Sequence, residues 1–217
     1  NRTVTVGANT FQSRVATSTI TWQQGPGRFG VLDVSAIFTN WLRSWQDPLL
    51  AGSFNIAGND DGWRVDSQGD YAYAVRASGS PDFVILNISN PSAPVLVGSI
   101  ALAGSALDID VSGNYAFVAS SVNAQELQVI NITNPALPVL AGSFNATGTD
   151  DANSVSVAGT RAYITRTGAP NFVIVNIAVP TSPTLLGSMN LGGTPRGTVE
   201  LGAYVFVASE SNTQELQ

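Results

Sequence analysis

A short motif of the form Pro-x-Leu-x-Gly-Ser occurs four times along the chain and constrains the fold more than any other feature. Its glycines are Gly52, Gly98, Gly142 and Gly187, which are 46, 44 and 45 residues apart. A fixed period of this length is typical of repeat architectures, in which one unit cannot bury its apolar face alone and neighbouring units stack. The chain is therefore expected to fold as a series of similar units of about 45 residues.

Each unit is predicted to contain four short antiparallel strands. A short strand ends at a Gly-Asn or Gly-Asp turn, which favours hairpins, and an aromatic strand follows it. The third strand is an apolar run, and an Asn-Pro turn separates it from the fourth. The second strands are expected at residues 71–75, 115–119, 161–165 and 204–208, and the third strands at 29–34, 83–88, 127–132 and 172–177.

Four strands in about 45 residues is the size of a β-propeller blade, so the predicted fold class is an all-β propeller. A β-sandwich is the competing architecture, but sandwiches do not repeat their sequence at a fixed period. In a propeller, Ile130 and Ile174 lie in the middle of third strands and should be buried between neighbouring blades.

The repeat divides the chain into one propeller or propeller segment. Blade one, with an N-terminal extension, is assigned to residues 1–62, and the following blades to 63–105, 106–149 and 150–192, with the start of a further blade at 193–217. The ends could pair to close a four-bladed ring, or the chain could be part of a larger propeller. A second strand counted at both ends favours the larger propeller.

A second period lies on the first. The sequence Gln125-Glu-Leu-Gln128 recurs 89 residues later as Gln214-Glu-Leu-Gln217. Alternate blades are thus more alike than neighbours, which indicates duplication of a two-blade unit.

The third strand, turn and fourth strand around residues 129–143 (VINITNPALPVLAGS), together with 111–119 (VSGNYAFVA) in the same unit, resemble the LVIVD repeat. The resemblance covers roughly residues 29–217. It implies a propeller in a bacterial or archaeal surface or secreted protein, and no reaction comes with it. The family pattern has Asp before the turn, which Asp33 keeps, whereas Asn87, Asn131 and Asn176 depart from it.

Composition narrows the possible chemistry. The chain has no histidine, cysteine or lysine and a net charge of −6, which excludes imidazole catalysis, thiol nucleophiles and Cys–His zinc sites. It offers no basic patch for nucleic acid and no run of 18 apolar residues for a membrane span. No cofactor and no enzymatic activity are expected. Low charge and many small polar residues favour an extracellular or cell-surface location.

Three sets of charged residues are candidate ligand sites. Arg64, Asp108 and Arg196 stand at the starts of first strands, where a propeller presents side chains at the mouth of its channel. Asp60-Asp61 and Asp150-Asp151 are weak calcium candidates, because turns commonly contain acidic residues and no calcium-loop spacing is present. Asp108 and Asp110 share one side of a strand, but no general acid accompanies them, so a structural role is favoured.

Blade one contains an insertion before its fourth strand. Phe38, Trp41, Leu42 and Trp45 follow the i, i+3, i+4, i+7 spacing of one helix face, which predicts a helical insertion over residues 36–46. Two tryptophans on an optional segment suggest an interface, whereas the competing interpretation is a lid that covers a blade edge.

Three classes of function are compatible with these features. The favoured one is a non-enzymatic extracytoplasmic scaffold, surface-exposed or filament-forming, that contacts a protein partner or assembles with itself. The second is a module that binds carbohydrate or peptide at the channel mouth. The third is a hydrolase or lyase built on a propeller.

Overall fold

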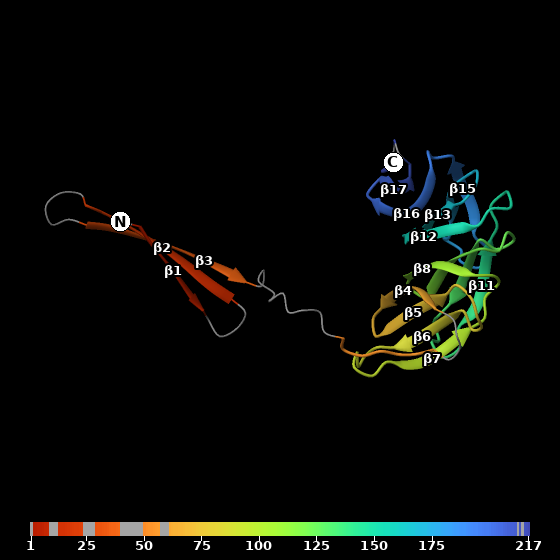
Figure 1. Ribbon diagram of the computed structural model, residues 1–217, viewed down its shortest axis with the longest axis horizontal. Helices are drawn as coiled ribbons and strands as arrows, with labels where there is room; N and C mark the ends of the chain where they lie inside the picture. The colour runs from red at the N-terminus through yellow and green to blue at the C-terminus, as the bar shows by residue number, and fades with distance from the viewer. Residues whose placement is uncertain are drawn as a thin grey trace. The chain divides into compact units, whose positions relative to one another are not determined.

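A computed structural model of the chain describes residues 2–8, 13–23, 29–39, 50–56, 61–211, 213 and 215–217. All of its regular elements are strands, as Figure 1 shows. The chain divides into two compact units, Asn1–Leu50 and Ala51–Gln217. The predicted all-β class with four-stranded antiparallel units is confirmed. In the described part, no helix is long and apolar enough to cross a membrane.

The first unit contains a three-stranded antiparallel sheet in the order β1-β2-β3. Its strands are β1 (Arg2–Ala8), β2 (Ser13–Gln23) and β3 (Phe29–Thr39). The ladder between β2 and β3 runs without interruption from Gln23↔Phe29 to Ser13↔Thr39.

This ladder places residues 36–39, the first part of the helical insertion predicted over residues 36–46, in a strand, whereas residues 40–46 lie outside the described residues. Residues 36–39 belong to β3, and Phe38 lies opposite Arg14 of β2. The segment Val34-Ser-Ala-Ile-Phe38 is a short apolar run, and such a run does not separate strand from helix by periodicity alone. The strand continues to Thr39 because the ladder with β2 gives each of these residues a backbone partner. Trp41, Leu42 and Trp45 lie outside the described residues.

The second unit contains three four-stranded blades and a hairpin, in which sequential strands are neighbours. Blade two contains β4 (Gly62–Gln68), β5 (Tyr71–Arg76), β6 (Phe83–Asn87) and β7 (Val95–Ile100). Blade three contains β8 (Ala106–Ser112), β9 (Tyr115–Ser120), β10 (Leu127–Asn131) and β11 (Val139–Phe144). Blade four contains β12 (Ala152–Ala158), β13 (Arg161–Arg166), β14 (Phe172–Asn176) and β15 (Thr184–Met189). The hairpin of blade five contains β16 (Thr194–Leu201) and β17 (Tyr204–Glu210).

A two-residue turn joins the first and second strands of each blade in the second unit. In blade three this turn is Gly113-Asn114, between the paired residues Ser112 and Tyr115. Gly113 has φ of 60°, a left-handed conformation that costs glycine little. The turn fixes the register of the hairpin, and with it which side chains face the next blade.

The core lies between blades. One apolar cluster joins blade two to blade three, a second joins blade three to blade four, and a third joins blade four to the blade-five hairpin. Ile130 is fully buried in the first of these clusters, as predicted. Ile174 is only half-buried, because the described part of blade five packs two strands, β16 and β17, against its side of blade four.

Candidate functional site

The first strands of successive blades, β4, β8, β12 and β16, lie next to one another and form the inner edge of the blades. Each is an edge strand of its own sheet, so its outward backbone groups have no ladder partner there. Carboxylates of the preceding blade accept some of these N–H groups. Asp66 accepts from Val111 N at 2.7 Å, and Asp110 accepts from Val157 N at 2.8 Å.

The two acidic residues of β8 are therefore accounted for as structural acceptors. Asp108 accepts the backbone N–H of Val155 at 3.1 Å, in the same way as Asp110 accepts that of Val157. Burial raises the pKa of both carboxyl groups above the ordinary value, and the nearby Asp66 carboxylate adds to this. Their backbone hydrogen bonds oppose the rise by favouring the charged form.

The structure brings together two of the three residues predicted at the channel mouth. The Nε atom of Arg64 lies 3.7 Å from an Asp108 carboxylate oxygen, and its guanidinium carbon lies 5.4 Å from the centre of the Trp63 ring. The third residue, Arg196, makes a two-pronged contact with Glu210 of its own hairpin, at 2.9 Å for each bond. The Arg196–Glu210 pair is exposed on both sides, and in the Arg64–Asp108 pair the Arg64 side chain is 53% exposed, so these pairs position side chains more than they stabilise the fold.

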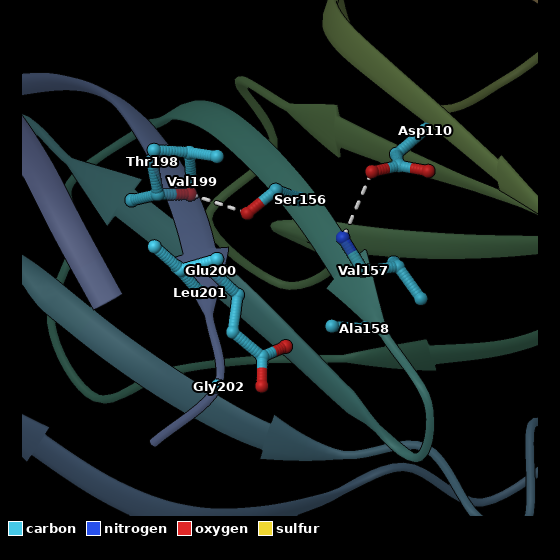
Figure 2. Close-up of a pocket in the computed structure, with 9 residues that line it drawn as sticks. All are labelled: Asp110, Ser156, Val157, Ala158, Thr198, Val199, Glu200, Leu201 and Gly202. Carbon is cyan, nitrogen blue, oxygen red and sulfur yellow. Dashed lines mark hydrogen bonds between the residues drawn. The ribbon is translucent and has the colours of Figure 1, made fainter. Parts of the chain in front are cut away.

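A pocket of about 410 Å³ opens at the inner edge, between β8, β12 and β16 (Figure 2). Its lining residues are Asp110, Ser156, Val157, Ala158 and Thr198 to Gly202. The hydroxyls of Ser156 and Thr198 bond to each other across the two blades. The Oε2 atom of Glu200 is buried and has no hydrogen-bond partner in the described part of the chain. The pocket thus offers carboxylate and hydroxyl oxygens to a polar ligand.

Three of the four weak calcium candidates lie in the described part of the chain. Asp60 lies outside the described residues, and Asp61 is exposed. The backbone N–H of Asp151 donates to the hydroxyl of Thr167, and the backbone N–H of Thr167 donates to the carbonyl of Asp151. The Asp150 side chain lies against Gly168. In the ranges that the structure describes, no three acidic side chains are grouped so that they could hold a metal ion.

A buried ion pair between blades three and four was missed by the sequence analysis. Arg166 Nε donates to Glu126 Oε1 at 2.9 Å, and a second guanidinium nitrogen lies 2.7 Å from the same oxygen. Glu126 also accepts the N–H of Ala146 at 2.7 Å. Both side chains are almost completely buried. Burial raises the pKa of Glu126, whereas the Ala146 N–H and the Arg166 guanidinium oppose the rise.

The signal for this pair was present in the two-blade period. Glu126 belongs to the repeated Gln-Glu-Leu-Gln sequence, and Arg166 has its counterpart at Arg76, 90 residues earlier. Neither observation alone shows that the two residues meet, because they come from different blades.

The fourth strands carry a further surface that the sequence analysis did not single out. β7, β11 and β15 are the outer edge strands of their sheets. Leu96, Leu140 and Leu185 stand at the same motif position in these strands and are 43%, 45% and 53% exposed. We call these three leucines the outer rim. Apolar side chains repeated on exposed strand edges are typical of surfaces that contact other proteins.

Comparison with known proteins identifies the repeat. The family model of the LVIVD repeat matches residues 61–101, 103–146 and 150–191, which correspond to blades two, three and four. No curated protein matches the chain.

Several solved structures share the fold at low sequence identity. A protein from Lactobacillus plantarum matches with a TM-score of 0.61 at 15% identity, over 93% of this chain and 62% of its own. A functionally unknown protein from Desulfotomaculum acetoxidans matches with a TM-score of 0.59 at 18% identity, over 92% and 57%. A candidate 6-phosphogluconolactonase from Bacteroides uniformis matches with a TM-score of 0.60 at 12% identity, over 94% and 62%. The chain thus spans about 60% of the length of these proteins, and the likeness shows a propeller-like fold alone.

Proposed function

Since the chain belongs to the LVIVD-repeat family, whose repeat specifies a fold and no reaction, we propose that it is a non-enzymatic scaffold outside the cytoplasm. It works through protein–protein contacts, either with a partner or with further copies, on a cell surface or in a filament. The outer rim is the observation that carries this proposal. Three blades present an exposed leucine at equivalent positions, so a partner meets the same apolar contact at regular intervals.

We propose no enzymatic role because the carboxylates at the inner edge hold neighbouring blades together. Asp66, Asp108 and Asp110 each accept a backbone N–H of the next blade, so their hydrogen-bonding capacity is partly committed to holding blades together. The chain has no histidine or cysteine to act as base or nucleophile.

The rim is tested by replacing Leu96, Leu140 and Leu185 together with Gln. We expect the wild-type chain to form assemblies in sedimentation velocity and electron microscopy, and the triple variant to lose them while its Tm stays unchanged. The matched control replaces Leu137 and Val179 with Gln, which are also exposed but lie in turns, and it should assemble like the wild type. A wild-type chain that stays monomeric at high concentration and binds no protein through the rim would contradict the proposal.

Location and activity have separate tests. Fractionation of the source cells should recover the chain from the envelope or the medium, and recovery from the cytoplasm would contradict an extracytoplasmic scaffold.

Because one matched structure is a candidate 6-phosphogluconolactonase, hydrolysis of that lactone is the sharpest activity assay. We expect no rate above the spontaneous one.

A binding module is the second candidate function, and the pocket at β8, β12 and β16 favours it. A carbohydrate or peptide with hydroxyl or cationic groups could bond to Asp110 and Glu200 there. A screen of glycans and basic peptides by thermal shift tests this function. A stabilising ligand whose effect disappears in Glu200→Ala would make binding the primary role and displace the scaffold.

A further inference from the structure

Two kinds of blade alternate along the second unit. They differ at a residue at or next to the end of the second strand, whose N–H donates to a backbone carbonyl at the equivalent position in every blade of that unit. That position is Arg76 in blade two, Ser120 in blade three, Arg166 in blade four and Ser209 in blade five. We call these the arginine type and the serine type. The residue that accepts this bond alternates with it, as Asp82, Glu126, Asn171 and Glu215, and the first three directly precede the third strands of their blades.

A serine-type blade binds the blade before it through backbone contacts. In blade three, Gln128 exchanges two hydrogen bonds with the backbone of Ala103, at 3.1 and 2.8 Å, and Ser120 Oγ donates to the same carbonyl. In blade five, Gln217 makes the same pair of bonds with Gly192, at 2.9 and 2.7 Å. The blade-five hairpin is thus attached to blade four in the way that blade three is attached to blade two.

A serine-type blade binds the blade after it through its glutamate. Glu126 of blade three pairs with Arg166 of blade four, and both side chains are almost completely buried. Phe117 and Leu127 lie in the same interface and are 2% and 0% exposed. An arginine-type blade therefore covers one apolar face of the serine-type blade before it. It also supplies the positive charge that pairs with the glutamate of that serine-type blade.

Blade five repeats this face without a cover. Glu215 occupies the position of Glu126, 89 residues on, and is exposed. Leu216 and Phe206 occupy the positions of Leu127 and Phe117 and are 67% and 38% exposed. The face has the composition of a buried interface and the exposure of a surface.

A glycine of the fourth strand gives independent support. A Cβ atom added at Gly98 or at Gly142 would collide with the carbonyl oxygen of the proline in the next blade's turn, Pro135 or Pro180. A Cβ atom at Gly187, the equivalent glycine of blade four, would meet nothing within 4 Å. Blade four thus keeps the gap into which a neighbouring turn fits.

We propose that Phe206, Glu215 and Leu216 form a docking surface for an arginine-type blade of this same repeat. The arginine at the end of the second strand of that blade pairs with Glu215, as Arg166 pairs with Glu126. The turn between the third and fourth strands of blade five, once those strands are supplied, fills the gap at Gly187. Charge complementarity and continuity with the interface between blades three and four identify this occupant, because a serine-type blade would leave the glutamate buried without a cation.

The repeat itself supplies the test. Gln214 to Gln217 is identical in sequence to Gln125 to Gln128, so a copy of residues 129–192 can follow Gln217 in register. This extended chain gains two strands for blade five and a complete arginine-type blade. We expect its Tm to exceed that of the original chain by at least about 5 °C, because a full interface becomes buried.

The ion pair is tested inside both chains. Glu215→Gln should leave the Tm of the original chain unchanged and should remove most of the gain of the extended chain. Replacing both partners by apolar residues, with Glu215→Leu and the appended copy of Arg166→Met, should recover much of it. Gly187→Ala is the second probe, neutral in the original chain and destabilising in the extended one.

Three results would overturn the proposal. One is an appended segment that stays sensitive to protease while the original blades remain folded. Another is a Glu215→Gln effect of equal size in the two chains. The last is a dimer of the original chain that dissociates on Glu215→Gln, because the surface would then bind a second copy instead of an added blade.

Discussion

Single residues in this fold act across blade boundaries. Asp66 and Asp110 each accept a backbone N–H from the next inner strand, and Glu126 pairs with an arginine 40 residues away. Such contacts join residues that are distant in sequence, and a buried pair is costly to break from one side because the remaining charge has no partner.

The buried pair gives the first prediction. Arg166→Met should lower the free energy of unfolding by about 3–5 kcal/mol, because Glu126 is left buried without its cation. Adding Glu126→Leu should recover much of the loss. Urea denaturation measures both. The control is Arg196→Met, which removes an exposed pair and should change little. If Arg166→Met and Arg196→Met lowered the free energy of unfolding equally, burial would not be what makes the Glu126–Arg166 pair costly to break.

The second prediction concerns pH. Burial raises the pKa of the Asp110 carboxyl in the folded chain above its value in the unfolded chain, so protonation of this group favours folding. This stabilisation is fully present below the ordinary carboxyl pKa and is lost as the pH rises through the raised pKa. Asp110→Asn keeps an acceptor for Val157 N and carries no charge. The variant should therefore unfold at a higher Tm than the wild type at pH 7, and the difference should vanish near about pH 3.5. A difference that is independent of pH would show that the carboxylate is not destabilised by burial.

At the scale of elements, most of the fold was predictable from the sequence. The glycine period, the turn residues and the apolar runs located the second and third strands of blades two to four, because these signals are local. The end of β3 was not predictable in this way, since its length depends on the pairing partner β2. The Glu126–Arg166 pair was not predictable either, because its geometry depends on how two blades stack.

Equivalent glycines give the third prediction. Gly142→Ala should cost about 1–3 kcal/mol, because the added Cβ atom would lie 2.5 Å from the carbonyl oxygen of Pro180 and the turn would have to shift. Gly187→Ala, at the same position of the next blade, should cost far less. Chemical denaturation of the two variants compares them directly. Similar costs would mean that the blade contact does not determine the requirement for glycine.

Two isoleucines of third strands, which face different blade boundaries, give the fourth prediction. Ile130→Ala should lose about 2–5 kcal/mol of unfolding free energy, because Ile130 is fully buried between blades two and three and the change leaves a cavity. Ile174→Ala should lose less, since that side chain is half-buried. Thermal or urea unfolding distinguishes the two. A loss below about 1 kcal/mol at Ile130 would contradict its place in the core.

At the scale of the whole molecule, the composition leads to the fifth prediction. The chain has no histidine or cysteine, and carboxylates alone favour hard cations that are held weakly. Metal analysis of the purified, dialysed chain should therefore find no stoichiometric zinc, copper or iron. One equivalent of any of them, retained through dialysis against a chelator, would contradict the prediction.

The alternation of arginine-type and serine-type blades also determines how such a chain can change length. Removing one blade would bring two blades of the same type together, and their boundary would bury either a glutamate without its arginine or an arginine without its glutamate. Removing two adjacent blades restores the order at every junction. Chains with this fold should therefore gain or lose blades in pairs during evolution. Homologous genes should differ by insertions and deletions of about 90 codons. Changes of about 45 codons should be selected against unless the pairing residues change with them.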